Sequence, residues 1–205
     1  MTDLPAFIAI LAIALVVPGP DFAFIVGSAA RGPHLGRAAA LGVVTGLSVH
    51  ATLAAAGISS LLAATSWGLD VLRVLGVAFL VWAGASTVVA TLRGGGAGTH
   101  VPAGAVTTRL AAWRRGLLGN LLNPKSLLFF LALMPQFVDP SRPTLPQVAL
   151  LSAVTVAAGA AWWGLVSHVA DRFSPLLQRP RVRRRVDLTT GLALLGLAGM
   201  IAVAA

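Results

Sequence analysis

Long hydrophobic runs separated by short polar stretches dominate the chain. The apolar segments cover residues 4–26, 38–64, 67–92, 113–138, 146–170 and 187–205. A helix needs about 20 apolar residues to cross the roughly 30 Å hydrocarbon core of a bilayer, and each segment is long enough to do so. The pattern therefore predicts an all-α integral membrane protein with six transmembrane helices.

The composition agrees with this pattern. Hydrophobic residues make up 57% of the 205 positions and charged residues only 10%. An ordinary soluble domain has about 25% charged residues, so this composition is typical of a membrane protein. Cysteine is absent, which excludes disulfides and thiol chemistry. The sequence contains no phosphate-binding loop, metal-ligand motif or nucleophile triad, so we expect no cofactor, no metal site and no enzymatic activity.

The arginines indicate how the helices are oriented. Those in or beside the odd-numbered loops are Arg31, Arg37, Arg93, Arg109, Arg114, Arg115, Arg172, Arg179, Arg181, Arg183, Arg184 and Arg185. Only Arg73 and Arg142 fall on the other side. Because positive loops stay cytoplasmic, both termini are predicted to be external. The same rule explains the net charge of +9 without nucleic acid, and the basic loops are expected to meet membrane lipid.

A glycine-rich stretch divides the chain into two halves. Residues 93–112 have the composition of a linker, between a three-helix half at 1–92 and another at 113–205. If two halves with an odd number of helices are related, their orientations in the membrane must be opposite. The sequence therefore predicts two inverted three-helix repeats, an architecture in which transporters bind substrate at paired helix breaks near mid-membrane.

Prolines place such a break in the first and fourth predicted helices. The break residues are Pro18, Gly19 and Pro20 in the first helix, and Asn123 and Pro124 in the fourth. Proline interrupts a helix but suits the first position of a new one, so Gly19 and Asn123 are predicted N-caps. Irregular backbone at membrane depth must be buried in protein or line a cavity, so the breaks are expected to meet in the interior.

The residue after each break proline is charged. Asp21 is the only acid deep in a segment, and Lys125 is the only lysine against fourteen arginines. A mid-membrane charge is costly and marks a candidate binding or coupling site. We expect Asp21 and Lys125 to neutralise each other without substrate, and to hold the ammonium and carboxylate of a substrate respectively. The alternative for Asp21 is a favourable acid in a first helical turn.

Other polar and small residues are weaker candidates. Asn120 and His50 are candidate substrate or coupling groups, although a membrane histidine can equally bond a neighbouring helix. Gly42 and Gly46 form a GxxxG pair, which suits a helix contact but also arises by chance in a chain so rich in glycine and alanine. The Trp162-Trp163 pair is interpreted as an interface anchor.

Two motifs resemble a known family. "PGPDFAFIV" in the first segment and "NPKSLLFFLALMPQFV" in the fourth, on a six-helix frame, are similar to the LysE/RhtB family of bacterial amino-acid exporters. The resemblance implies efflux of an amino acid such as lysine, arginine, threonine, homoserine or leucine, or a related metabolite, across the bacterial inner membrane. It also implies driving by the proton gradient or membrane potential, and it allows a homodimer.

The sequence thus favours a secondary exporter of a small amino acid or derivative. One alternative is a metal-ion or small-cation exporter on a related frame. A cation site usually needs several carboxylates, whereas Asp21 is the only acid deep in a segment and the chain contains no glutamate. Another is a non-transporting membrane scaffold. An intramembrane enzyme has no supporting site in the sequence.

Overall fold

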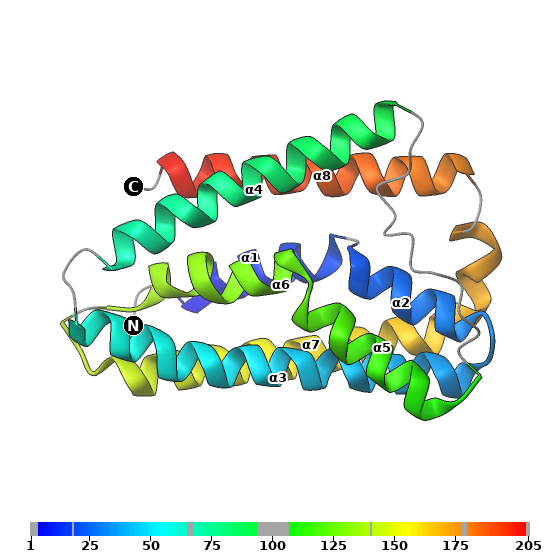
Figure 1. Ribbon diagram of the computed structural model, residues 1–205, viewed down its shortest axis with the longest axis horizontal. Coiled ribbons are helices and arrows are strands. Elements are labelled where there is room, and N and C mark those ends of the chain that lie inside the picture. Colours follow the sequence, from blue (N-terminus) through cyan, green and yellow to red (C-terminus); the bar gives the residue numbers. More distant parts are fainter. Residues whose placement is uncertain are drawn as a thin grey trace.

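The computed structural model describes residues 4–17, 19–64, 68–93, 107–139, 141–177 and 180–203, and for some of these, chiefly in 58–83 and 171–203, only the backbone. The described part is all-helical (Figure 1). The elements are α1 (Leu4–Val16), α2 (Pro20–Ala29), α3 (Pro33–Ala64), α4 (Gly68–Leu92), α5 (Arg109–Leu121), α6 (Pro124–Leu128), the π-helix η1 (Phe129–Leu133), the 3₁₀-helix η2 (Met134–Phe137), α7 (Thr144–Leu177) and α8 (Pro180–Val203).

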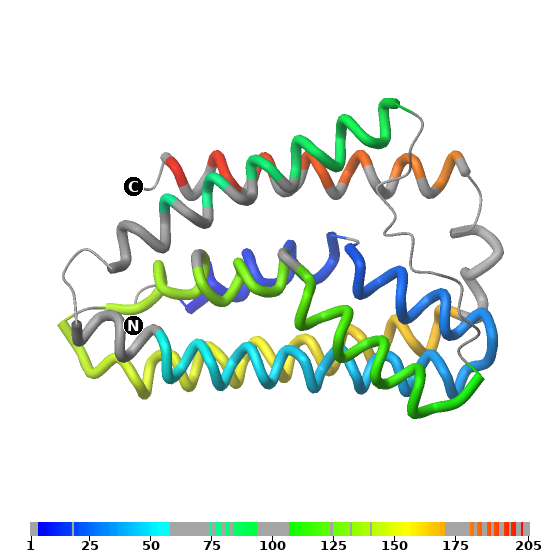
Figure 2. Tube along the Cα trace, in the orientation of Figure 1, coloured from blue at the N-terminus to red at the C-terminus, as the bar shows by residue number. Residues whose placement is uncertain are grey.

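The helices form three groups along one long axis. Helices α3 and α7 pack side by side, and α4 packs against α8 on the opposite side of the molecule (Figure 1). Of the two broken helices, α1 with α2 runs between these pairs, whereas the other begins with α5, which slants across α3, and continues with α6 between the pairs. Their ends meet near the middle of the bundle, where they are linked by hydrogen bonds (Figure 2).

The number of membrane spans is supported only in part. By length and composition, Pro33–Gly57 and Thr144–Ala170 qualify alone. The pairs Leu4–Val16 with Pro20–Ala29 and Arg109–Leu121 with Lys125–Phe137 qualify if each is one span, with bends of 51° and 50°. Helices α4 and α8 cover the third and sixth predicted segments, and their side chains are only partly described. Six spans therefore stays a prediction, as does the repeat.

Several helices extend beyond the apolar segments. Helix α8 begins at Pro180, so the described part of "RPRVRRR" is its first turns rather than a loop. Helix α5 begins at Arg109, inside the predicted linker, most of which lies outside the described residues. Arginine side chains on such turns extend their charge toward the headgroups, so a helix need not end where its apolar run ends.

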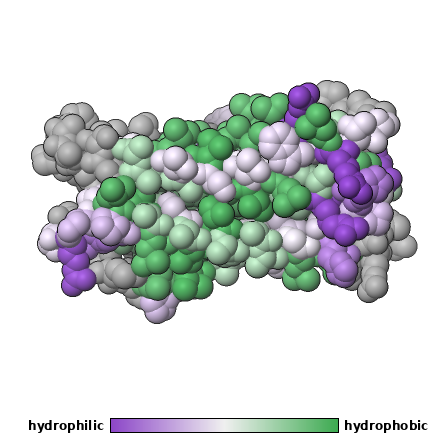
Figure 3. All heavy atoms as spheres, turned by 90° about the horizontal axis from the view of Figure 1, so that it is seen from below, coloured by the Kyte–Doolittle hydropathy of each residue, from purple (hydrophilic) through white to green (hydrophobic). Residues whose placement is uncertain are grey.

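Polarity separates along the long axis of the molecule. The α2–α3 turn, the C-terminal end of α4 and the N-terminal ends of α5 and α8 lie at one end, whereas α1 begins and α8 ends at the other (Figure 1). On the face in Figure 3, a band of hydrophobic residues lies between two ends where hydrophilic residues gather. Large apolar side chains on α3 are exposed, such as Leu41 at 64% and Leu53 at 63%, as expected for a protein surrounded by lipid.

Glycines allow two of the helix pairs to approach closely. A Cβ on Gly42 would overlap the carbonyl oxygen of Trp113 on α5, and one on Gly116 would overlap that of Ala39 on α3. Between α4 and α8, a Cβ on Gly84 would lie 2.8 Å from the Gly191 oxygen. The GxxxG pair on α3 therefore lies at a helix contact, as small residues in membrane helices often do.

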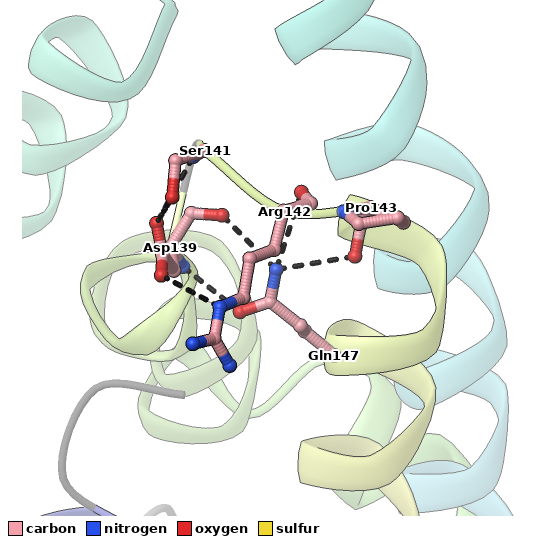
Figure 4. Close-up of polar contacts among 5 residues, drawn as sticks. All are labelled: Asp139, Ser141, Arg142, Pro143 and Gln147. Carbon is pink, nitrogen blue, oxygen red and sulfur yellow. Dashed lines mark hydrogen bonds and ion pairs between the residues drawn. The ribbon is translucent and has the colours of Figure 1, made fainter.

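Helices η2 and α7 are joined by a tightly bonded turn (Figure 4). The buried Gln147 side chain donates to the carbonyls of Asp139 at 3.0 Å and Pro143 at 3.1 Å, and accepts the Asp139 N–H at 2.9 Å. The Asp139 carboxylate accepts the Ser141 hydroxyl at 2.6 Å and pairs with Arg142 Nε at 3.4 Å. These hydrogen bonds pair backbone N–H and C=O groups of the turn that have no partner within a helix.

Candidate functional site

Both predicted helix breaks are present, with the expected caps. Gly19 is the N-cap of α2, in extended conformation, and Pro20 is the first helical residue. Asn123 is the N-cap of α6, and its side-chain oxygen accepts the Lys125 N–H at 3.0 Å. Local chemistry explains both breaks, since proline ends one helix and starts the next. Pro18 lies outside the described residues, and of Pro124 only the backbone is described.

Asp21 lies in the interior, 2% exposed, in the first turn of α2. Its Oδ2 accepts hydrogen bonds from Asn123 Nδ2 at 2.8 Å, Asn120 Nδ2 at 3.0 Å and Ser126 Oγ at 3.4 Å. Its other oxygen, Oδ1, is buried without a hydrogen-bond partner. All three donors belong to the second half of the chain, so this carboxylate joins the two broken helices.

Lys125 makes a complementary link in the opposite direction. Its Nζ donates to the carbonyl oxygens of Ala14 at 2.9 Å and Val17 at 2.8 Å, at the C-terminal end of α1. The last carbonyls of a helix lack partners within it and carry its negative dipole end, so an ammonium suits this position. A Cβ on Gly19 would lie 3.3 Å from Nζ, so the missing side chain gives the lysine room.

Neutralisation of Asp21 by Lys125 stays a prediction, but it does not take the form of a direct ion pair. The described residues include no ion pair between them, although an electrostatic attraction between the two side chains remains. Each charged side chain instead bonds to polar groups at the opposite break. Asp21 accepts from side-chain amides and Lys125 donates to backbone carbonyls, whereas the sequence suggested that the two would bind each other.

Asn120 connects these links to α3. Its side chain is 0% exposed, and Nδ2 also donates to Ser126 Oγ at 3.0 Å. Its backbone oxygen lies 3.2 Å from His50 Nε2, so that nitrogen carries the proton and donates. The His50 ring stacks on Phe130, with centroids 5.8 Å apart. Of the two interpretations of His50, the bond to a neighbouring helix is the one observed.

The sequence did not single out two contributors to this cluster. Ser126 follows Lys125 directly, and its place in the first turn of a helix that starts at a break was the available signal. Gly46 was noted only as a packing glycine, but a Cβ there would lie 2.6 Å from Asn120 Oδ1. The contact of Gly46 with Asn120 arises from packing between segments distant in the chain, so no local motif could reveal it.

The arrangement is a buried polar site between two half-helix starts. It holds one carboxylate, one ammonium, two side-chain amides and a hydroxyl inside an apolar bundle. Breaks of this kind near mid-membrane are where transporters built from broken helices bind small polar or zwitterionic molecules.

Comparison with known proteins places the chain among membrane transporters. The family model described as LysE type translocator matches residues 12–205. An uncharacterized membrane protein of Vibrio cholerae is 29% identical, with 98% of each chain covered. A homoserine/homoserine lactone efflux protein of Salmonella typhi is 28% identical over 77% of this chain and 75% of that protein. A leucine efflux protein of Salmonella choleraesuis is 35% identical over 63% and 60%. No solved structure matches the chain significantly.

Proposed function

Because the chain belongs to the LysE type translocator family, we propose that it is a secondary exporter of a small amino acid or a derivative of one. Relatives named as leucine and homoserine/homoserine lactone efflux proteins support this substrate class. The observation that carries the proposal is the buried Asp21 carboxylate, held by donors of the opposite broken helix and left with a free oxygen. An ionisable group at this depth is expensive and is usually retained for binding or coupling.

The proposed site consists of the two breaks and the residues that contact them. Its members are Pro18, Gly19, Pro20, Asp21, His50, Asn120, Asn123, Pro124 and Lys125. The half-helix starts offer backbone N–H groups, and relative movement of the broken helices would expose Asp21 to one side of the membrane and then the other. The proton gradient or the membrane potential would drive export.

The architecture proposed for this cycle is two inverted repeats, at residues 1–92 and 113–205. The similar bends of 51° and 50° support it, because breaks of the same kind in the first helix of each half are what a duplicated, inverted unit would contain. The clustering of arginine-bearing helix ends supports a bacterial inner-membrane protein with both termini external.

Counterflow in proteoliposomes tests the proposal directly. Vesicles loaded with one unlabelled amino acid at a time are diluted into a trace of the same labelled compound, with leucine and homoserine as first probes. We expect transient accumulation of at least one compound, sensitive to pH or potential. If none of the common amino acids, homoserine or homoserine lactone accumulated, the exporter assignment would be rejected.

A further inference from the structure

Two oxygen atoms in the site have no hydrogen-bond partner. They are Oδ1 of Asp21 and Oδ1 of Asn120, on side chains that are 2% and 0% exposed. The two side chains are joined to each other by the 3.0 Å bond from Asn120 Nδ2 to Asp21 Oδ2, so both free atoms belong to one small cluster. Buried acceptors are almost always satisfied, so a pair of free ones indicates that a donor is missing.

The orientation of the Asn120 amide is determined by its neighbours. Its nitrogen donates to both a carboxylate oxygen and the Ser126 hydroxyl. Exchanging the nitrogen and the oxygen would place an acceptor against the Asp21 carboxylate, which is unfavourable. The free atom is therefore an oxygen. It faces α3 at Gly46, where the missing side chain leaves it room.

The positive group at the site has partners already. Lys125 Nζ donates to the carbonyls of Ala14 and Val17, and so holds the end of α1. Two of the three N–H groups of this ammonium are held by those carbonyls, so it can offer a substrate carboxylate only its one remaining N–H without releasing the end of α1. The site thus has free acceptors for an ammonium, whereas two of the three donors of its lysine are engaged at the end of α1.

We propose that the site recognises its substrate through a primary ammonium group, bound by Asp21 Oδ1 with Asn120 Oδ1, and that the substrate carboxylate is dispensable. This inference rests on the proposed function and specifies its substrate class. The class comprises amino acids and their esters, amides and lactones. Hydroxy acids and N-acyl amino acids, which lack the ammonium, are excluded.

Competition in the counterflow assay tests the inference on the wild-type protein. With leucine as the labelled probe, the competitors are leucine methyl ester and leucinamide, which keep the ammonium, and 2-hydroxyisocaproate and N-acetylleucine, which lack it. If homoserine is the transported probe, homoserine lactone and a hydroxy acid of the same length take their places. We expect the first group to compete within about tenfold of the parent and the second to be weaker by about 100-fold or more, because unpaired site acceptors penalise a ligand without donors.

The outcomes separate the inference from the proposed function. Equal competition by the hydroxy acid, or failure of the ester and amide, would overturn ammonium recognition while leaving an exporter. Absence of transport for every amino acid and amine would remove both. If instead Na⁺ stabilised the purified protein against heating at constant ionic strength, and the ester did not, the free oxygens would form a cation site and the inference would be wrong.

A pair of variants locates the effect. Asp21→Asn keeps the size of the side chain and replaces an acceptor with a donor, so it should abolish leucine binding, measured as the loss of the ligand-induced shift in melting temperature. Ser152→Ala on α7 is the control, because its hydroxyl is buried but contacts Met134 rather than the site. It should retain the shift. An Asp21→Asn protein that kept the full shift would contradict the assignment.

Discussion

Asp21 and Lys125 occupy the same position after two helix breaks, and each binds groups at the other break rather than its counterpart. Asp21, in α2, accepts from Asn120 and Asn123 at 3.0 and 2.8 Å. Lys125, in α6, donates to two carbonyls at the end of α1. Both links connect the first broken helix to the second, so any motion of one break relative to the other must disturb them.

Replacing Lys125 should therefore damage transport by releasing the end of α1. In Lys125→Met the Ala14 and Val17 carbonyls lose their donor, at about 1–3 kcal/mol for each buried group left unpaired, offset in part by removal of a buried charge. We expect export to be lost while the protein still reaches the membrane. Counterflow and membrane immunoblots provide the measurement, and export at the wild-type rate would show the lysine to be passive.

The conservative change Lys125→Arg should also fail. A guanidinium is larger than an ammonium and planar. The ammonium already lies close to Gly19, where even an added Cβ would be 3.3 Å from Nζ. We expect a lower melting temperature than wild type as well as reduced export. A fully active arginine variant would indicate that any cation can cap α1.

Gly46 should tolerate no side chain. In Gly46→Ala the new Cβ would lie 2.6 Å from Asn120 Oδ1 and displace that amide from Asp21. Overpacking of this kind costs about 1–3 kcal/mol, so both stability and transport should fall. Gly57→Ala on the same helix is the matched control, because nothing lies within 4 Å of its Cβ position and alanine favours the helix by up to about 1 kcal/mol. Equal behaviour of the two variants would refute the close approach.

His50 should act through its N–H group rather than through its charge. His50→Phe keeps a ring to stack on Phe130 but leaves the Asn120 carbonyl with one donor fewer, whereas His50→Gln keeps an N–H donor. We expect the phenylalanine variant to lose about 1 kcal/mol of stability and part of its transport, and the glutamine variant to recover both. A glutamine variant as impaired as phenylalanine would show that the N–H donor is not what His50 supplies.

The turn between η2 and α7 should weaken in acid. Hydrogen bonds from the Ser141 hydroxyl and N–H lower the pKa of the Asp139 carboxyl below its usual value. Because the folded pKa is depressed, the stabilisation is complete above the ordinary carboxyl pKa and is lost as the pH falls through the folded value. The melting-temperature difference between wild type and Asp139→Asn should be constant near neutral pH and shrink on acidification. A pH-independent difference would contradict this account.

The absence of native cysteine makes topology simple to test with single introduced cysteines. Thr107 precedes α5, and Leu145 lies in the first turn of α7, 57% exposed, at the other end of the molecule. A membrane-impermeant thiol reagent applied to cells with a permeabilised outer membrane should label Leu145→Cys. It should label Thr107→Cys only after the inner membrane is opened. The reverse pattern would invert the proposed orientation.

The amino-acid sequence by itself determined where the helices break and begin. Proline acts on its own turn, so Gly19-Pro20 and Asn123-Pro124 set the starts of α2 and α6 and placed Asp21 and Lys125 at matching positions without help from packing. The apolar segments likewise located the long helices, because a bilayer demands a minimum apolar length. The family resemblance rested on these same local motifs.

Only the tertiary structure decided which groups these side chains bind. The partners of Asp21 lie about a hundred residues away in the chain, and a buried charge takes whichever donors helix packing brings within reach. For the same reason the interface-anchor interpretation was wrong for Trp163, which is 2% exposed in the core. In a membrane, helix faces that contact lipid and those that contact protein are both apolar, so residue types alone do not distinguish them. The packing of neighbouring helices determines which faces are covered by protein.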